Sequence, residues 1–308
     1  MSGKIISIAN MKGGVGKTTL AVCLALSYAK KIHGHAAPRV LLVDLDAQAN
    51  ASFWLCGDSV LTELIEGGKT IDAFLEDTLL FSMKRPLLDF LHDVWEEGPN
   101  GRRLSVIPSS PELRLVEREL IYFLSEGKRS LREIEAELGE RFAHELDALR
   151  CRFDIILFDT APGISALTEA ALRASDMILV PTIPDFISNL GLEAFCRSVW
   201  KNNREGARSR LPHVVANMVK ETSHHAIMLS EMRSEAGATD AGFCMLDTQI
   251  PNSLAIEESG GLAGISQDRT ELQLDETAKA QFQALADEIW MMLEAVEQEP
   301  AHVRRAAG

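Results

Sequence analysis

The sequence predicts an α/β protein with a doubly wound, mostly parallel sheet of about seven strands and helices on both faces. Short apolar runs alternate with longer amphipathic stretches along the whole chain. Most of the short runs are apolar almost throughout, which is typical of parallel strands covered by helices on both sides. Successive β and α units of this kind join through right-handed crossovers. In such folds ligands bind beyond the carboxyl ends of the strands.

The predicted elements follow one another in order along the chain. We expect strands at residues 4–9, 39–43, 104–107, 154–158, 177–180, 214–218 and 245–250. We expect helices at residues 18–31, 111–124, 131–149, 190–200 and 276–296. The helix at 131–149 carries acidic and basic residues three and four positions apart, a pattern typical of a solvated helix that flanks a sheet.

Residues 1–297 are expected to fold as a single domain. The chain has 308 residues, which is longer than most single domains, but open α/β sheets of this size often fold as one unit. Residues 63–103 contain two glycine-rich turns around helical pieces, so we interpret them as an elaborated crossover. Residues 298–308 are predicted to form a disordered tail.

The composition indicates a protein of the cytoplasm. Apolar residues make up 46% of the chain and charged residues 25%, which is ordinary for a soluble globular protein. No apolar run is long enough to span a bilayer, and the N-terminus lacks the features of a signal peptide. The five cysteines are scattered without a CxxC pair, which favours reduced thiols over a disulfide framework or a zinc site.

The charge balance limits the partners that the whole molecule can attract. The chain has 45 acidic and 31 basic residues, a net charge of −14. Such a chain has no global field that would draw it to nucleic acid or to anionic membranes. Any binding to DNA must therefore come from a local basic patch.

The first predicted strand leads into the run N-M-K-G-G-V-G-K-T-T, and a helix follows. Glycines allow backbone N–H groups to turn towards a phosphate, and the helix N-terminus adds partial positive charge. Lys17 should reach the β- and γ-phosphates of a nucleotide, and the Thr18 hydroxyl should bind Mg²⁺. The usual phosphate-loop pattern fails at its first position, Met11, and a second lysine, Lys12, precedes the glycine pair. A chance glycine-rich turn is the alternative interpretation.

Two further predicted strands end in aspartate. The second strand runs into V-D-L-D, which contains Asp44 and Asp46, and a later one runs into L-F-D, which ends at Asp159. Residues two apart on a strand point the same way, so Asp44 and Asp46 should both face the phosphate loop. The Asp159 arrangement is that of a Walker B strand, whose aspartate contacts Mg²⁺ through water. The Asp-x-Asp motif alone could be ordinary turn chemistry, and the Asp159 motif alone is a weak signal.

Together these motifs resemble the ParA/MinD family of ATPases. The run K-G-G-V-G-K-T-T, residues 12–19, is similar to the family's deviant Walker A motif. The run D-L-D-A-Q-A-N resembles switch I with Ala47 in place of proline, and D-T-A-P-G resembles switch II with Ala161 in place of the first proline. The resemblance implies a P-loop NTPase fold, ATP and Mg²⁺ as ligands, and Mg²⁺-dependent hydrolysis of ATP to ADP and phosphate. It also implies a homodimer that forms with ATP.

The resemblance assigns roles to individual residues. Lys12 would reach across the dimer interface to the partner's nucleotide, Asp44 would help to hold the Mg²⁺ hydration shell, and Asp46 would orient the attacking water. Asn217 stands where relatives read adenine, and the loop that begins at Ile250 resembles the one that closes over the base, with Asn252 where arginine is usual. The implied nucleotide-binding residues are Lys12, Gly13, Gly14, Val15, Gly16, Lys17, Thr18, Thr19, Asn217 and Pro251. The implied catalytic residues are Lys12, Lys17 and Asp46, and the implied metal ligands are Thr18, Asp44 and Asp159.

The closest branch is the ParA-type partitioning ATPases. No cysteine follows switch II, which disfavours relatives that carry metal clusters, and the last predicted helix has an acidic polar face, which disfavours membrane binding. The resemblance implies an ATP dimer that binds DNA non-specifically, associates with the nucleoid, and segregates or positions a DNA or protein cargo. A ParB-like or other stimulating partner would trigger hydrolysis.

One basic run is the candidate DNA-binding surface: Arg197, Lys201, Arg204, Arg208 and Arg210. A solvated helix end and loop would have the same composition, so this interpretation stays open. Two other functions also stay open: an ATP-switched regulatory or assembly factor that binds only proteins, and a metabolic ligase on the same fold. The ligase would need a second substrate pocket.

Overall fold

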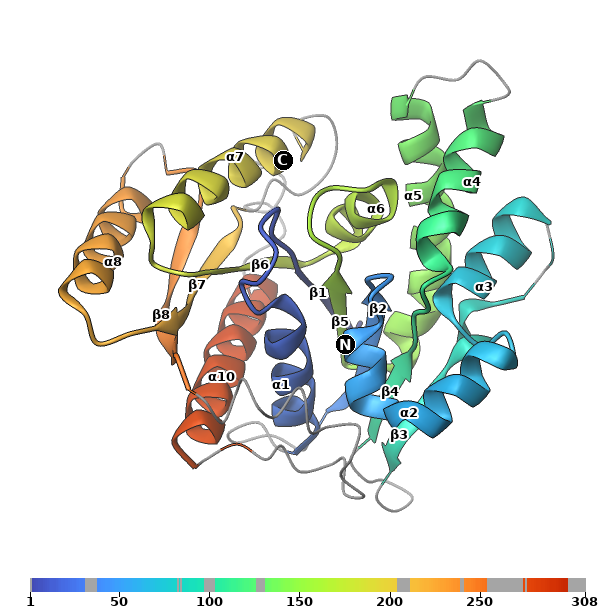
Figure 1. Ribbon diagram of the computed structural model, residues 1–308, viewed down its shortest axis with the longest axis horizontal. Coiled ribbons are helices and arrows are strands. Elements are labelled where there is room, and N and C mark those ends of the chain that lie inside the picture. Colours follow the sequence, from blue (N-terminus) through green and yellow to red (C-terminus); the bar gives the residue numbers. More distant parts are fainter. Residues whose placement is uncertain are drawn as a thin grey trace.

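The computed structural model describes residues 2–30, 38–81, 83, 85–96, 103–125, 131–203, 211–238, 241–253, 274 and 276–298. Within them the chain forms a doubly wound α/β fold around an eight-stranded sheet in the order β3-β4-β2-β5-β1-β6-β7-β8 (Figure 1). The strands are β1 (Lys4–Ile8), β2 (Arg39–Leu45), β3 (His92–Glu96), β4 (Arg103–Ile107), β5 (Ile155–Thr160), β6 (Met177–Thr182), β7 (His213–Val219) and β8 (Cys244–Pro251). The helices are α1 (Lys17–Lys30), α2 (Asn50–Glu66), α3 (Ile71–Leu75), η1 (Glu76–Leu80), η2 (Leu87–Phe90), α4 (Leu113–Ser125), α5 (Leu131–Arg152), α6 (Ala166–Ala174), α7 (Phe186–Asn203), α8 (Ser223–Ala236) and α10 (Glu276–Gln298).

The parallel core of the sheet confirms the predicted fold class. β1 lies between β5 and β6, and β5 lies between β1 and β2, with parallel pairing throughout. Every residue of β5 and β6 is buried, as expected of strands covered on both faces. The order reverses on either side of β1, so the switch point of the sheet falls where the glycine-rich run leaves that strand.

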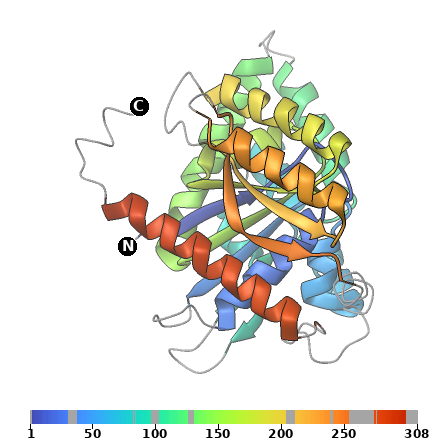
Figure 2. The ribbon, with the colours of Figure 1, turned by 90° about the vertical axis from the view of Figure 1, so that its left-hand side faces the viewer.

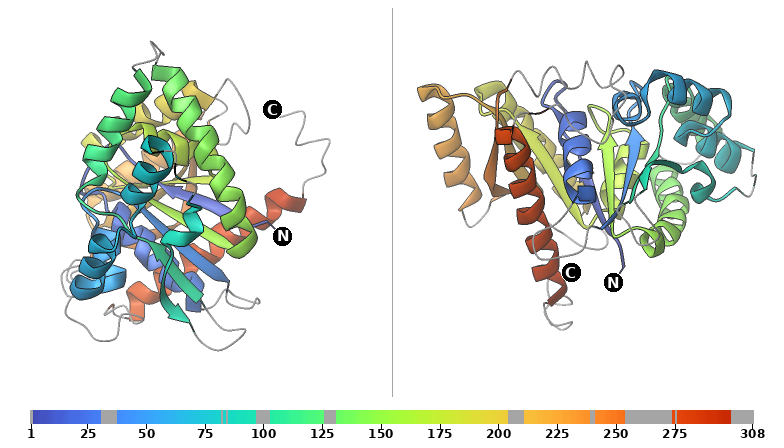
Figure 3. Two further views of the ribbon diagram at one scale, coloured as in Figure 1. Left: turned by 90° about the vertical axis from the view of Figure 1, so that its right-hand side faces the viewer. Right: turned by 90° about the horizontal axis from the view of Figure 1, so that it is seen from below.

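The strand count differs from the predicted seven because β3 adds an eighth strand at one edge (Figure 3, left panel). β3 pairs with β4 in antiparallel orientation and lies inside the predicted crossover, residues 63–103. Its sequence, H-D-V-W-E, is not an apolar run, because an edge strand can carry polar side chains. Asp93 accepts hydrogen bonds from Arg103 and Ser105 of β4, at 2.6 Å each, and these contacts fasten the strand.

Helices cover both faces of the sheet. One face packs against α1, α2 and α10, through strand residues such as Ile6, Leu42 and Leu157. The opposite face packs against α3, α4, α5 and α6 near β2 and β5, and against α7 and α8 near β6 and β7. Figure 2 shows α8 lying across β7 and β8, at the edge of the sheet opposite β3.

The last helix, α10, packs against α1 and β8 (Figure 1). Phe282, Leu285, Ile289 and Leu293 are all buried there. None of the helices in the described part of the chain is long and apolar enough to cross a membrane. The predicted tail, residues 298–308, lies outside the described residues except for its first position.

Shortening one buried side chain of α10 should destabilise the fold. We expect Leu285→Ala to lower the free energy of unfolding by about 2–5 kcal/mol, because it leaves a cavity between α10 and α1. Met291 lies on the same helix and is 62% exposed. Met291→Ala should therefore change the unfolding free energy by less than about 0.5 kcal/mol. Urea denaturation of the two variants measures the difference, and equal losses would contradict the packing of α10.

Candidate functional site

The carboxyl ends of the three central strands place the predicted residues together. In the register of the sheet, Asp159 of β5 is the partner of Ile8 in β1 and of Asp44 in β2. The chain leaves β1 just after Ile8 and enters α1 at Lys17, so the glycine-rich loop lies above these two aspartates. The structure thus brings the loop, Asp44 and Asp159 to one point, as the sequence indicated.

The loop before α1 has the backbone of a phosphate-binding turn. Gly14 and Gly16 have φ values of 74° and 83°, in the region that favours glycine. A side chain on Gly14 would meet no atom within 4 Å, so its conformation, not crowding, requires glycine. The N-terminus of α1 follows at once and supplies free N–H groups and partial positive charge. This arrangement is suited to binding an anion.

The ammonium group of Lys17 is held inside this loop. Lys17 is only 6% exposed, and its Nζ donates a hydrogen bond to the carbonyl oxygen of Lys12 at 3.1 Å. Burial lowers the pKa of Lys17, while the charges of Asp159 and Asp46 raise it. The lysine is thus positioned by the loop and faces the acidic strand ends.

Asp44 is fully buried and is bound by donors of its own chain. Its Oδ1 accepts from the Asp46 backbone at 3.1 Å, and its Oδ2 accepts from the backbone and hydroxyl of Ser52 at 2.9 and 2.6 Å. Ser52 Oγ in turn accepts from the Ser109 backbone at 2.8 Å. Burial raises the pKa of Asp44 to about 6, although these hydrogen bonds lower it. Asp44 therefore joins the ends of β2 and β4 to α2.

Asp159 is equally buried, and neither of its oxygens accepts a hydrogen bond of good geometry from the described residues, although the Thr18 hydroxyl lies close enough to lower its pKa. Burial and the nearby Asp44 raise the pKa of Asp159, and the Thr18 hydroxyl and Lys17 only partly oppose this. A buried carboxylate without a partner is rare and costly. It fits a site for a cation, and Thr18 lies on the same side to share it.

The residues present fit Mg²⁺ but do not enclose it. Mg²⁺ is commonly bound by one or two carboxylates or hydroxyls together with phosphate oxygens and water. No three His, Cys, Asp or Glu side chains gather as a metal site in the part of the chain that the structure describes. Thr18 and Asp159 would therefore hold the ion together with a phosphate group, and Asp44 would act through the hydration shell.

Asp46 lies at the turn that follows β2. It is 7% exposed, and its Oδ1 accepts from the Gln48 backbone at 3.0 Å. Ala49, the residue that precedes α2, has a φ of 51°, which is uncommon for a residue other than glycine. Such strained residues are often found at functional sites. The hydrogen bond from the Gln48 backbone to Asp46 helps to fix this turn.

Lys12 points to the start of α7, outside the loop. Its Nζ donates to the Ser188 hydroxyl at 2.7 Å and lies 3.6 Å from Asp185 Oδ2. Asp185 Oδ1 also accepts from the Ser188 backbone at 2.7 Å, which caps the helix. The side chain of Lys12 keeps 33% of its surface exposed. Exposed apolar residues lie beside Lys12 and Asp185 in the sequence: Met11 in the loop, and Phe186, Ile187 and Leu190 at the start of α7.

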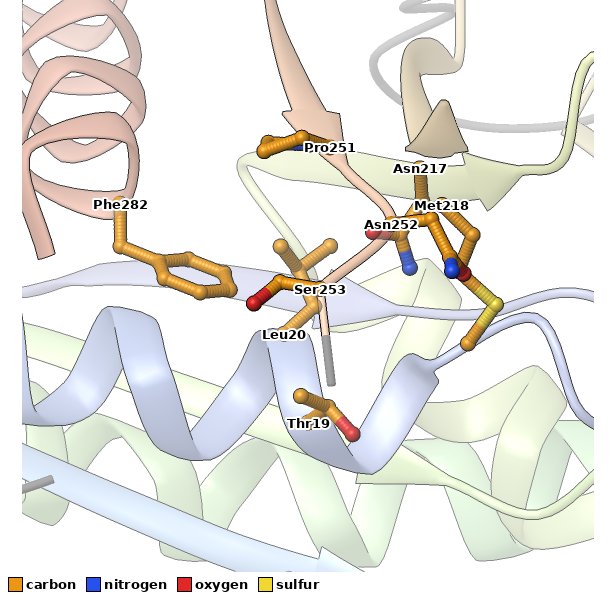
Figure 4. Close-up of a pocket in the computed structure, with 8 residues that line it drawn as sticks. All are labelled: Thr19, Leu20, Asn217, Met218, Pro251, Asn252, Ser253 and Phe282. Atoms are coloured by element: carbon orange, nitrogen blue, oxygen red, sulfur yellow. The ribbon is translucent and has the colours of Figure 1, made fainter. Parts of the chain in front are cut away.

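A pocket opens on the other side of the loop (Figure 4). It is a shallow depression whose empty space, including adjoining solvent, is about 290 Å³. Its lining residues are Thr19, Leu20, Asn217, Met218, Pro251, Asn252, Ser253 and Phe282. Figure 4 shows Phe282 pointing from α10 towards Leu20 and Ser253. The pocket contains both residues predicted to contact adenine, Asn217 and Pro251. The rest of the predicted closing loop, residues 254–261, lies outside the described residues.

Sequence reasoning missed several residues that support the site. Asn10 donates to the Pro181 carbonyl at 2.9 Å and accepts from the Lys12 backbone at 3.0 Å, so it anchors the start of the loop. Ser52, Asp185 and Ser188 also had no predicted role. Asn10 could have been found from its place between a strand and a phosphate loop. The others follow from long-range contacts that no local pattern reveals.

The basic run proposed for DNA cannot be placed. Arg204, Arg208 and Arg210 lie outside the described residues, and the side chains of Arg197 and Lys201 in α7 are not described either. The DNA-binding assignment therefore stays a prediction.

Comparison with known proteins adds a family match. A family described as an AAA domain matches residues 3–211. The chain is 34% identical over 197 residues to the chromosome partitioning protein ParA of Myxococcus xanthus, and 32% identical over 197 residues to the sporulation initiation inhibitor protein Soj of Bacillus subtilis. Each match covers 64% of this chain, and they span 58% and 65% of the two relatives. The chain thus covers less than two thirds of the length of either one.

Solved structures share the fold. Cobyrinic acid a,c-diamide synthase from Mycobacterium smegmatis, with bound ADP and magnesium, superposes with a TM-score of 0.64. The match covers 95% of this chain and 96% of the other at 19% identity, which shows a common fold and no more.

The orphaned carboxylate provides a test of the site without any ligand. Because burial raises the pKa of Asp159, ionising it opposes folding above the ordinary carboxyl range and costs nothing below that range. We expect Asp159→Asn to raise the free energy of unfolding by about 1–3 kcal/mol at neutral pH, and the gain should vanish at a pH of about 3.5. Urea denaturation without Mg²⁺ or nucleotide measures this.

The matched control is Asp58→Asn, because Asp58 is exposed. It should leave stability unchanged at both pH values. A loss of stability in Asp159→Asn at neutral pH would mean that Asp159 already has a partner in the folded protein.

Proposed function

Because this chain belongs to the ParA/MinD family of deviant Walker A ATPases, within the AAA-domain family that matches residues 3–211, we propose that it binds ATP with Mg²⁺ and hydrolyses it to ADP and phosphate. The observation that carries this proposal is the buried, unpartnered carboxylate of Asp159 beside Lys17 and the anion-binding loop. A bound cation would give the Asp159 carboxylate a partner, and the phosphate chain that carries it would accept hydrogen bonds from Lys17 and from the loop.

The chain's own groups then have separate tasks. Backbone N–H groups of residues 13–19 and the Lys17 ammonium bind the phosphates and hold them in place. The Thr18 hydroxyl and Asp159 would hold the metal ion, which would neutralise phosphate charge. Asp46, fixed on its turn by Gln48, is proposed to orient the attacking water. The pocket around Asn217 and Pro251 takes the base.

Lys12 is proposed to act on the nucleotide of a second copy. In the single chain it is bound to Ser188 and Asp185, so it must leave these partners to reach across an interface. Lys12 and Asp185 keep 33% and 31% of their side-chain surface exposed, and an exposed ion pair of this kind is worth only about 0–1 kcal/mol. Ser188 is buried, so losing the hydrogen bond to its hydroxyl adds a cost of about 0.5–1.5 kcal/mol. Contacts with the second copy must offset both terms. The exposed apolar residues beside Lys12 give a second copy a surface to cover.

The wider role we propose is partition: an ATP dimer that binds DNA without sequence preference, associates with the nucleoid and moves or positions a cargo. The name of one relative supports partition, since it is called a chromosome partitioning protein. A ParB-like partner would stimulate hydrolysis. The net charge of −14 argues that DNA contacts are confined to a small surface.

Removing the Asp46 carboxylate should separate ATP binding from hydrolysis. We expect Asp46→Ala to bind ATP as wild type does, to hydrolyse it at least about 100-fold more slowly, and to accumulate as a dimer. Light scattering with ATP and a phosphate-release assay measure both effects. Lys17→Ala is the control, because it should lose ATP binding itself. An Asp46→Ala protein that remains monomeric with saturating ATP would contradict the dimer.

DNA binding should depend on ATP and salt. The Asp46→Ala dimer should shift random-sequence duplex at low ionic strength, and its affinity should fall steeply with salt because each neutralised phosphate releases counterions. Replacing Arg204, Arg208 and Arg210 with glutamate should abolish the shift and leave dimerisation intact. If the ATP dimer ignores DNA at low salt, a switch that binds only proteins becomes the better function.

A further inference from the structure

The carboxyl end of β7 has an irregular backbone. The pairing of β7 with β8 shifts register between Ala216 and Val219, and Met218, between them, has a φ of 53°. A left-handed conformation costs a residue other than glycine about 1–2 kcal/mol. Irregularities of this kind redirect a side chain within a sheet. The neighbouring side chain is Asn217, which is 5% exposed.

Asn217 binds the phosphate loop directly. Its Nδ2 donates a hydrogen bond to the carbonyl oxygen of Val15 at 2.7 Å, across 202 residues of sequence, and Val15 is fully buried. A Cβ atom on Gly16 would come within 2.4 Å of the same Nδ2. Gly16 therefore allows Asn217 to approach the loop, in addition to adopting its positive φ. Figure 4 shows Asn217 and Met218 beside the start of α1.

This hydrogen bond restrains the part of the loop whose backbone has the greatest conformational freedom. Gly14 and Gly16, which flank Val15, both have positive φ values and high intrinsic freedom. Asn217 joins the carbonyl between them to the rigid sheet. Without the amide, a buried carbonyl would lose its partner, which disfavours this loop conformation.

We propose that Asn217 is a positioning residue that fixes the phosphate loop in its anion-binding conformation. This role is separate from any contact with the base, because the group bound is the loop backbone. The proposal rests on the proposed function only in that the anion is the phosphate chain of a nucleotide. Asn217→Leu and Asn217→Ala both remove the donor. Leucine keeps the same number and branching of heavy atoms but is larger than asparagine, whereas alanine is smaller, so an effect common to both variants reports the loss of the donor.

The first measurement uses the full chain without any ligand. Amide hydrogen exchange of residues 13–17, followed by mass spectrometry, should be about tenfold faster in both Asn217 variants than in wild type. Asn252→Leu is the matched control: Asn252 lines the same pocket but is exposed, and exchange in the loop should not change. Thermal unfolding by circular dichroism identifies any variant that is unfolded. Unchanged exchange in a folded Asn217 variant overturns the proposal.

The second measurement separates the loop from the base. Inorganic tripolyphosphate with Mg²⁺ has no base, and its affinity is measured by competition with a fluorescent ATP analogue. Both Asn217 variants should bind tripolyphosphate about tenfold more weakly than wild type. Asn252→Leu should bind it normally. Weaker ATP binding with unchanged tripolyphosphate binding would mean that Asn217 acts on the base alone. If wild type binds neither compound, the proposed function fails, and the exchange measurement alone decides the role of Asn217.

Discussion

The physical constraint on which this structure depends is the burial of Asp159 at the carboxyl end of the central strand β5. Parallel pairing with β1 and β2 brings it next to Asp44 and below Lys17. One lysine faces three aspartates within this site, since Asp46 also contributes to its electrostatics. The uncharged remainder of the sheet cannot solvate this surplus of negative charge. A bound cation would offset this burial, and a ligand that carried one would stabilise the folded domain by mass action.

The two buried carboxylates differ in the hydrogen bonds that they receive. Asp44 accepts hydrogen bonds from donors of its own chain, namely Ser52 and the backbone of Asp46. Asp159 receives none among the described residues. Asp44 therefore links β2 to α2 and β4, whereas the Asp159 carboxylate remains available to an ion. Two aspartates that are partners in the sheet register thus have different surroundings and different roles.

Much of this site could be predicted from the sequence because its parts are local. A glycine-rich run between a strand and a helix, and aspartates at strand ends, each occupy a few consecutive residues, and the topology alone brings them together. Partners that depend on tertiary contacts could not be predicted. Ser188 meets Lys12 across 176 residues, and Asn217 meets Val15 across 202. β3 was not predicted for another reason: an edge strand has one neighbour, so its sequence need not be apolar.

The burial of α1 has a consequence for motion. Thr18, Thr19 and Lys30 are its only residues that are not buried, so this helix lies within the core. A helix packed on all sides has no low-energy way to shift, because close-packed interiors resist displacement. Any response to the state of a bound nucleotide must arise in segments with few buried side chains. Residues 161–166, which follow β5 and are half-buried or exposed around Gly163, are such a segment. The buried helix α1 is thus the part of this region that resists displacement, and the segment after β5 is the part with room to move.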